Sequence, residues 1–90
     1  MDIQTIQKNW KDRGFSCEVW TDPPGQVWED FRHETDELVF LLEGELELEM
    51  KGKKQLLKKE EEVLIPAKVL HSVRNKGRGP SKWLYGYKKP

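Results

Sequence analysis

Three side chains of types that bind metal ions are spread over the middle and later part of the sequence: His33, Glu37 and His71. Two imidazoles and a carboxylate suit iron, zinc, manganese and nickel alike, so residue types do not select one metal. Three protein ligands would leave a coordination position open for water or substrate, as a catalytic metal requires. Taken singly, each histidine is more often a structural residue with a hydrogen-bond partner.

His33 and Glu37 can bind one ion only if the chain bends between them. On a single extended strand their side chains would share a face but lie ~13 Å apart, whereas metal–ligand bonds are only ~2 Å long. The intervening residues 34–36 are Glu, Thr and Asp, and the side chains of Asp and Thr readily bond turn backbone groups. We therefore predict a tight turn that places His33 and Glu37 on neighbouring strands, facing the same cavity.

His71 lies on another predicted strand, where Val69, His71 and Val73 alternate on one face. That face is otherwise apolar, so it should point into the protein interior. A buried imidazole without a partner costs roughly 1–3 kcal/mol. We therefore expect His71 to accept or donate a hydrogen bond there, or to bind a metal ion.

The elements that must position these side chains are short strands after one helix. Within residues 1–14, Ile3, Ile6 and Trp10 are apolar residues at helical spacing, and Gly14 can end the helix. From residue 15 onward the pattern has period two, and turn formers recur, as in Thr21 to Gly25. Such spacing predicts an all-β, antiparallel barrel or sandwich with a short N-terminal helix. We expect one domain over residues 1–90, with a helical segment at 1–14 and a barrel at 15–90.

Composition excludes several classes of protein. Sixteen basic residues balance sixteen acidic ones, so no net field draws the chain to nucleic acid or to an anionic membrane. Cys17 is the one cysteine, which excludes an internal disulfide and a thiolate zinc site, and we expect it to be packed rather than reactive. The N-terminal residues lack the apolar core of a signal peptide, so we predict a cytoplasmic protein with no membrane or nucleic-acid partner.

The segment 37–42 is apolar on both faces. On a strand, Val39 and Leu41 share a face with Glu37, and the opposite face carries Leu38, Phe40 and Leu42. The outward row must be covered, either by the N-terminal helix or by a second copy of the chain. We predict a homodimer on this ground.

Two segments together resemble the conserved motifs of the cupin superfamily, in particular its small single-domain members. Residues 25–44 are similar to the first motif, G-x5-H-x-H-x3-4-E-x6-G, with phenylalanine in place of the first histidine: Gly25, Phe31, His33, Glu37 and Gly44. Residues 60–75 resemble the second motif, G-x5-P-x4-H-x3-N, with glutamate in place of its glycine: Glu60, Pro66, His71 and Asn75.

The resemblance implies a jelly-roll β-barrel, also called a double-stranded β-helix, open at one end. In metallated members the ion lies inside the barrel, and His33, Glu37 and His71 match the second, third and fourth ligand positions. Phe31 would share a strand face with His33 and point where the missing imidazole would reach the metal. Two alternatives follow: a three-ligand site with open positions, or a degenerate site.

The resemblance also indicates a function in general terms. We expect a divalent metal (Fe, Zn, Mn or Ni), no organic cofactor, and a small-molecule ligand with an apolar portion. The predicted lining residues of the barrel are Phe31, Trp28, Asn75, Trp83 and Tyr85, although core packing or a dimer contact is the commoner role of such aromatic residues. Cupins include several enzyme classes and non-catalytic binders, so the reaction is left open. The alternatives are a metabolite-binding or sensor protein with a degenerate metal site, and an inert structural barrel.

Overall fold

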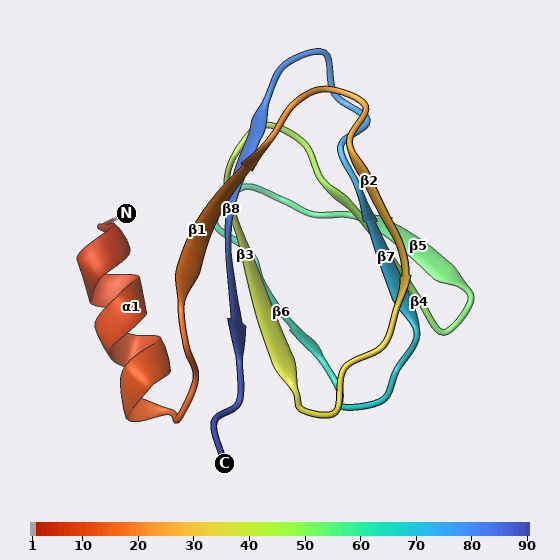
Figure 1. Cartoon of the computed structure of the whole chain (residues 1–90). Coiled ribbons are helices and arrows are strands. Elements are labelled where there is room, and N and C mark those ends of the chain that lie inside the picture. Colours follow the sequence, from red (N-terminus) through yellow and green to blue (C-terminus); the bar gives the residue numbers. More distant parts are fainter. Residues whose placement is uncertain (1) are drawn as a thin grey trace.

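The computed structural model describes residues 2–90, and Met1, which opens the predicted helical segment 1–14, lies outside this range. One helix, α1 (Ile3–Asp12), precedes eight strands (Figure 1). The strands are β1 (Glu18–Asp22), β2 (Val27–Phe31), β3 (Glu37–Glu43), β4 (Glu47–Met50), β5 (Lys53–Leu56), β6 (Glu62–Ile65), β7 (His71–Arg74) and β8 (Ser81–Tyr87).

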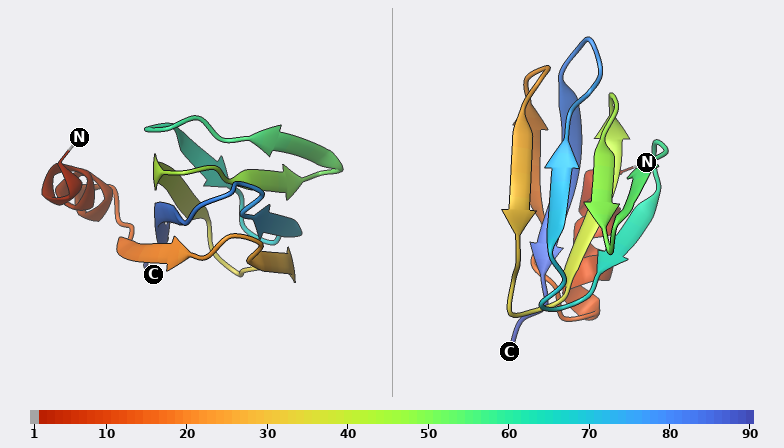
Figure 2. Two further views of the ribbon diagram at one scale, coloured as in Figure 1. Left: turned by 90° about the horizontal axis from the view of Figure 1, so that it is seen from above. Right: turned by 90° about the vertical axis from the view of Figure 1, so that its right-hand side faces the viewer.

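The strands form two four-stranded antiparallel sheets, with orders β1-β8-β3-β6 and β2-β7-β4-β5. Most consecutive strands switch from one sheet to the other, as in a jelly roll. The two sheets lie face to face, and α1 lies outside the sheet that contains β1 and β8 (Figure 2). The predicted antiparallel jelly-roll barrel with a short N-terminal helix is confirmed.

The main core lies between the sheets and follows from the alternation of each strand. Val39 and Leu41 of β3 pack in one cluster with Leu48 of β4 and with Leu46, which immediately precedes β4, and all four side chains are buried. Removing such side chains from water supplies most of the stability of a domain of this size. The same alternation turns Glu37 inward with Val39 and Leu41, so the strand that builds the core also brings a carboxylate into it.

The opposite face of β3 is covered by the helix. Leu38 and Phe40 pack with Ile6 and Trp10 of α1, and Leu42 joins the same cluster. The indole of Trp10 also donates a hydrogen bond of 2.8 Å to Glu62 on β6. The N-terminal helix, rather than a second copy of the chain, therefore covers this face of β3. The outward apolar row no longer supports the predicted homodimer. Within residues 2–90, no helix has the length and apolar character to cross a membrane.

Candidate metal centre

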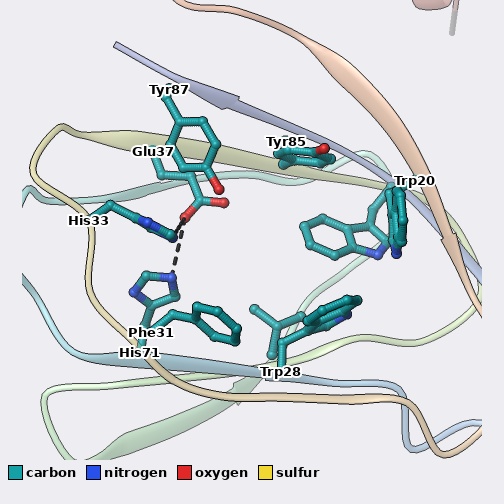
Figure 3. Close-up of a pocket in the computed structure, with 10 residues that line it drawn as sticks. Trp20, Trp28, Phe31, His33, Glu37, His71, Tyr85 and Tyr87 are labelled. Carbon is teal, nitrogen blue, oxygen red and sulfur yellow. Dashed lines mark ion pairs between the residues drawn. The ribbon is translucent and has the colours of Figure 1, made fainter.

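The three predicted ligands meet at one end of the barrel (Figure 3). Glu37 begins β3 in one sheet, His71 begins β7 in the other, and His33 lies in the connection between β2 and β3. One candidate ligand atom from each residue lies within 4.8 Å of the other two. The side chains of Glu37 and His71 are almost fully buried, and that of His33 is 28% exposed.

The bend predicted at residues 34–36 is present, but its consequence differs from the prediction. The chain bends at Glu34 and Thr35. However, β2 and β3 belong to opposite sheets and are not neighbouring strands. The turn therefore leads the chain across the barrel end from one sheet to the other. As a result, Glu37 comes from one sheet, His71 from the other, and His33 from the connection between them.

Two connections hold this end of the barrel together. The link from β2 to β3 runs beside the link from β6 to β7 (Figure 1). The backbone N–H of Lys68 donates to the carbonyl of His33 at 2.7 Å. The N–H of Ala67 donates to the Asp36 carboxylate, also at 2.7 Å. His33 is therefore fixed by backbone contacts although it lies outside a strand.

The distances within the group suit an ion better than they suit direct contact. Oε1 of Glu37 lies 3.3 Å from Nε2 of His71 and 3.5 Å from Nε2 of His33. Two ligand atoms on a tetrahedral ion with ~2.1 Å bonds are ~3.4 Å apart. Both imidazoles are within ion-pair distance of Glu37, yet neither is aligned for a hydrogen bond. Among the described residues, Oε1 of Glu37 has no hydrogen-bond partner, an arrangement that is costly unless a cation lies there.

A hydrogen bond at Nδ1 of His71 determines which ring nitrogen is free to bind a metal ion. Nδ1 lies 3.0 Å from the carbonyl of Val69, and a carbonyl only accepts, so Nδ1 carries a proton. In the neutral ring, Nε2 then presents a lone pair toward Glu37, which is the form that binds metal. Without a metal, burial disfavours the imidazolium, but Glu37 and the Val69 carbonyl outweigh it and raise the pKa of His71.

This pKa shift predicts opposite pH dependences with and without metal. A pKa of His71 above its ordinary 6.5 stabilises the metal-free protein below about pH 6.5 and is lost as pH rises through the folded-state pKa. In chelator, we expect a higher melting temperature near pH 6 than near pH 8.5, and a smaller difference in His71→Gln. Metal stabilisation should instead grow with pH because ligands must lose protons. An identical pH dependence in wild type and His71→Gln would contradict this account.

A cavity of about 210 Å³ adjoins the group. It is lined by His33, Glu37 and His71 at one end and otherwise by six aromatic rings and a valine, namely Trp20, Trp28, Phe31, Trp83, Tyr85, Tyr87 and Val73. Four of the five predicted lining residues are in this set. Trp20, Val73 and Tyr87 also line the cavity, and the alternation of Val73 with His71 and of Tyr87 with Tyr85 on their strands indicates two of them.

Asn75 is the predicted lining residue that is not in the cavity wall. Its buried amide donates to the carbonyls of Asp22, Pro23 and Gly79 and accepts from the N–H of Gly77. It therefore ties the β1–β2 and β7–β8 connections together. Because every donor and acceptor of the amide has a backbone partner, Asn75 has a structural role.

Phe31 reaches the cavity because β2 contains a bulge. The register with β7 shifts between Trp28 and Phe31, and Asp30 adopts a positive φ of 58°. A bulge re-aims the side chains that follow it, so Trp28 and Phe31, three residues apart, both face inward. The Phe31 ring stacks on His33 with centroids 6.1 Å apart. In the backbone register of β2 and β7, Phe31 lies opposite His71.

Asp22 organises the aromatic end of the cavity, and the sequence did not indicate this role. Its carboxylate is 1% exposed. It accepts hydrogen bonds from the indole N–H groups of Trp20 at 2.7 Å, Trp28 at 3.1 Å and Trp83 at 3.1 Å. In the sequence, Asp22 looked like a turn residue before two prolines.

Two other titratable groups are made less reactive by burial. Burial, followed by Glu37 and Tyr85, raises the pKa of Tyr87 to about 12, so its phenol stays protonated next to the candidate ligands. Burial, with a smaller effect of Glu18, raises the pKa of Cys17 to about 11. A thiol with this pKa is a poor nucleophile, as expected for a packed cysteine.

Comparison with known proteins identifies the same architecture. A family model described as a cupin domain matches residues 18–87. The Cupin_2 domain of an XRE family transcriptional regulator from Enterobacter cloacae is 25% identical, with a TM-score of 0.77, 90% of this chain covered and 88% of that one. A predicted oxalate decarboxylase from Thermotoga maritima is 21% identical, with a TM-score of 0.77 and coverages of 92% and 74%.

A cupin superfamily protein from Desulfitobacterium hafniense is also 21% identical, with a TM-score of 0.75 and coverages of 84% and 68%. At 21% identity these last two likenesses show the fold alone. No curated protein sequence matched the chain.

Proposed function

The chain belongs to the cupin family, and from this membership we propose that it binds a divalent metal ion through His33, Glu37 and His71. A small molecule would bind beside the ion in the barrel interior. The observation that carries the proposal is the buried Oε1 of Glu37, which has no hydrogen-bond partner within residues 2–90 but lies 3.3 and 3.5 Å from two imidazole nitrogens. A cation at their common centre would satisfy all three groups.

The arrangement around the ion favours an open site. Three protein ligands leave room for a ligand oxygen or a water molecule. Iron, zinc, manganese and nickel all accept two imidazoles and a carboxylate. When bound, such an ion polarises a coordinated oxygen or lowers the pKa of a coordinated water. The protein itself holds His71 in one tautomer, keeps Tyr87 protonated and surrounds the coordinated molecule with aromatic side chains.

A second candidate is a metabolite-binding or sensor protein that carries out no reaction. The observation that favours it is Phe31, which stands where the first motif has its first histidine and stacks on His33. The 25% identical cupin domain of a transcriptional regulator shows that this fold also occurs in regulators. In this candidate the cavity binds its ligand without depending on the metal.

Elemental analysis separates the two candidates. We expect protein purified without chelator or immobilised nickel to contain about one divalent ion per chain, and the His33→Ala/His71→Ala double variant to contain almost none. Glu45→Gln, a change at an exposed carboxylate, is the matched control and should keep the ion. A wild-type protein that stays metal-free after incubation with each of the four metals would overturn the proposal. Ligand-induced melting shifts in that apo protein would then support the second candidate.

A further inference from the structure

The end of the cavity opposite the candidate metal ligands is built from indoles. Figure 3 shows Trp20, Trp28 and Tyr85 across the cavity from His33, Glu37 and His71. Trp83 completes this wall, with its ring centroid 5.6 Å from that of Tyr85. The rings of Trp20 and Trp28 meet edge to face at 6.1 Å. We call Trp20, Trp28, Trp83 and Tyr85 the tryptophan end.

The charges at the tryptophan end are negative. Asp22 lies behind the three indoles and receives a hydrogen bond from each. Within residues 2–90, no lysine, arginine or histidine lies within ion-pair distance of Asp22, whose partners are neutral N–H donors. Among the described residues, the cavity wall contains no lysine or arginine either, and its one carboxylate is Glu37. A cation entering the cavity would therefore meet no competing positive side chain.

Indole is the best aromatic partner for a cation because its ring faces are the most negative. A carboxylate bonded to the indole N–H adds to this negative potential, and the low dielectric of the interior strengthens it. The same rings would also accept a neutral apolar group, but such a group gains nothing from Asp22. The buried carboxylate of Asp22 is thus the feature that favours a cationic ligand group over a neutral one.

We propose that the tryptophan end binds a methylated ammonium group carried by the small-molecule ligand. An ammonium with N–H groups would need acceptors, and the oxygens of Asp22 are already engaged by indoles, whereas N-methyl groups need none. The cavity, at about 210 Å³, exceeds the ~150 Å³ that admits benzene. It has room for one trimethylammonium head with a short tail. This inference rests on the proposed function only in placing the ligand inside the barrel.

The test compares choline with 3,3-dimethylbutan-1-ol, which has the same shape but no charge. Titrations of 15N-labelled protein, followed at the indole N–H resonances, report both affinity and position. The sequence has four tryptophans, and Trp10 is an internal control because it lies on α1, is buried outside the cavity and bonds Glu62. We expect choline to shift the other three resonances and to bind about three- to thirtyfold more tightly than the neutral isostere.

Variants test whether the tryptophan end causes the preference for choline over the neutral isostere. Trp20 is 42% exposed, so its replacement is tolerable to the fold. Trp20→Leu should lose most of the preference for choline, while Trp20→Phe should keep part of it. Leu56→Ala, at an exposed residue outside the cavity, should behave as wild type. Equal or tighter binding of the neutral isostere, no binding of either compound, or a preference unchanged in Trp20→Leu would overturn the inference.

The same titration in the His33→Ala/His71→Ala variant separates this inference from the proposed metal site. If the choline preference persists there, the tryptophan end acts independently of the metal. A protein that binds metal but does not prefer choline would refute the inference alone. A protein that prefers choline but never binds metal would refute the metal proposal alone.

Discussion

Replacing Asp22 by alanine is expected to lower the melting temperature by roughly 10 °C or more. The change leaves the indole N–H groups of Trp28 and Trp83 without their acceptor, and each buried donor left unpaired costs about 1–3 kcal/mol. For a domain of this length, about 1 kcal/mol corresponds to a shift of about 4–8 °C. Trp20 adds little because its half-exposed indole can turn toward water. Thermal unfolding followed by circular dichroism measures the effect.

The matched control is Asp12→Ala, at an exposed carboxylate of α1 whose partner is Lys8. Exposed i,i+4 pairs contribute only about 0.3–0.5 kcal/mol, so this variant should melt close to wild type. Asp22→Asn should fall between the two, since its amide keeps one oxygen acceptor but directs its own N–H groups at indole donors. A loss below about 1 kcal/mol in Asp22→Ala would mean that the three indoles find other partners, and that Asp22 does not organise the cavity wall.

The arrangement around His71 and Glu37 was accessible from the sequence because it depends on local spacing. Strand alternation alone turns His71 and Val73 of β7 to one side, whereas Val69, which was expected on the same strand, precedes it. The polar residues 34–36 indicated the bend before Glu37, and the structure has it. The cupin motifs then added what alternation cannot, namely that two distant strands face each other. Sequence reasoning therefore succeeded where each residue's orientation is set by its own strand.

The tryptophan end could not be predicted in this way. Asp22 and Trp83 are 61 residues apart in the sequence and meet only because β1 pairs with β8. Nothing near Asp22 distinguishes a turn residue from a buried acceptor of indole donors. The bulge at Asp30 likewise depends on the pairing of β2 with β7 and on a bond from its N–H to the Ser72 hydroxyl. Both features belong to tertiary contacts.

The departures of this chain from the cupin motifs have different consequences. Glu60 stands where the second motif has glycine and adopts a φ of 65°, a left-handed conformation that costs a non-glycine residue roughly 1 kcal/mol. The backbone keeps the shape of the motif, with the N–H of Glu60 donating to the carbonyl of Leu41 at 2.7 Å. The Glu60 substitution is therefore a modest cost in stability. Phe31 instead changes the chemistry of the cavity, because it replaces a metal ligand type by an apolar ring.

Replacing Phe31 by histidine is expected to tighten metal binding by about tenfold or more, a gain of about 1.4 kcal/mol. Residue 31 lines the cavity, is paired with His71 across the strands and stacks on His33. An imidazole at this position would offer a fourth protein ligand without a change of backbone. Competition against a chromophoric chelator measures the affinity for each metal.

Phe31→Leu is the control, since it also removes the ring but offers no ligand, and its metal affinity should stay near that of wild type. The two variants separate coordination from the relief of crowding. If both bind more tightly, the phenylalanine ring obstructs the site rather than replacing a ligand. If Phe31→His binds no more tightly than wild type, the bulge at Asp30 has turned residue 31 away from the ion. His33, Glu37 and His71 would then be all the protein ligands that these strands and the β2–β3 connection can supply.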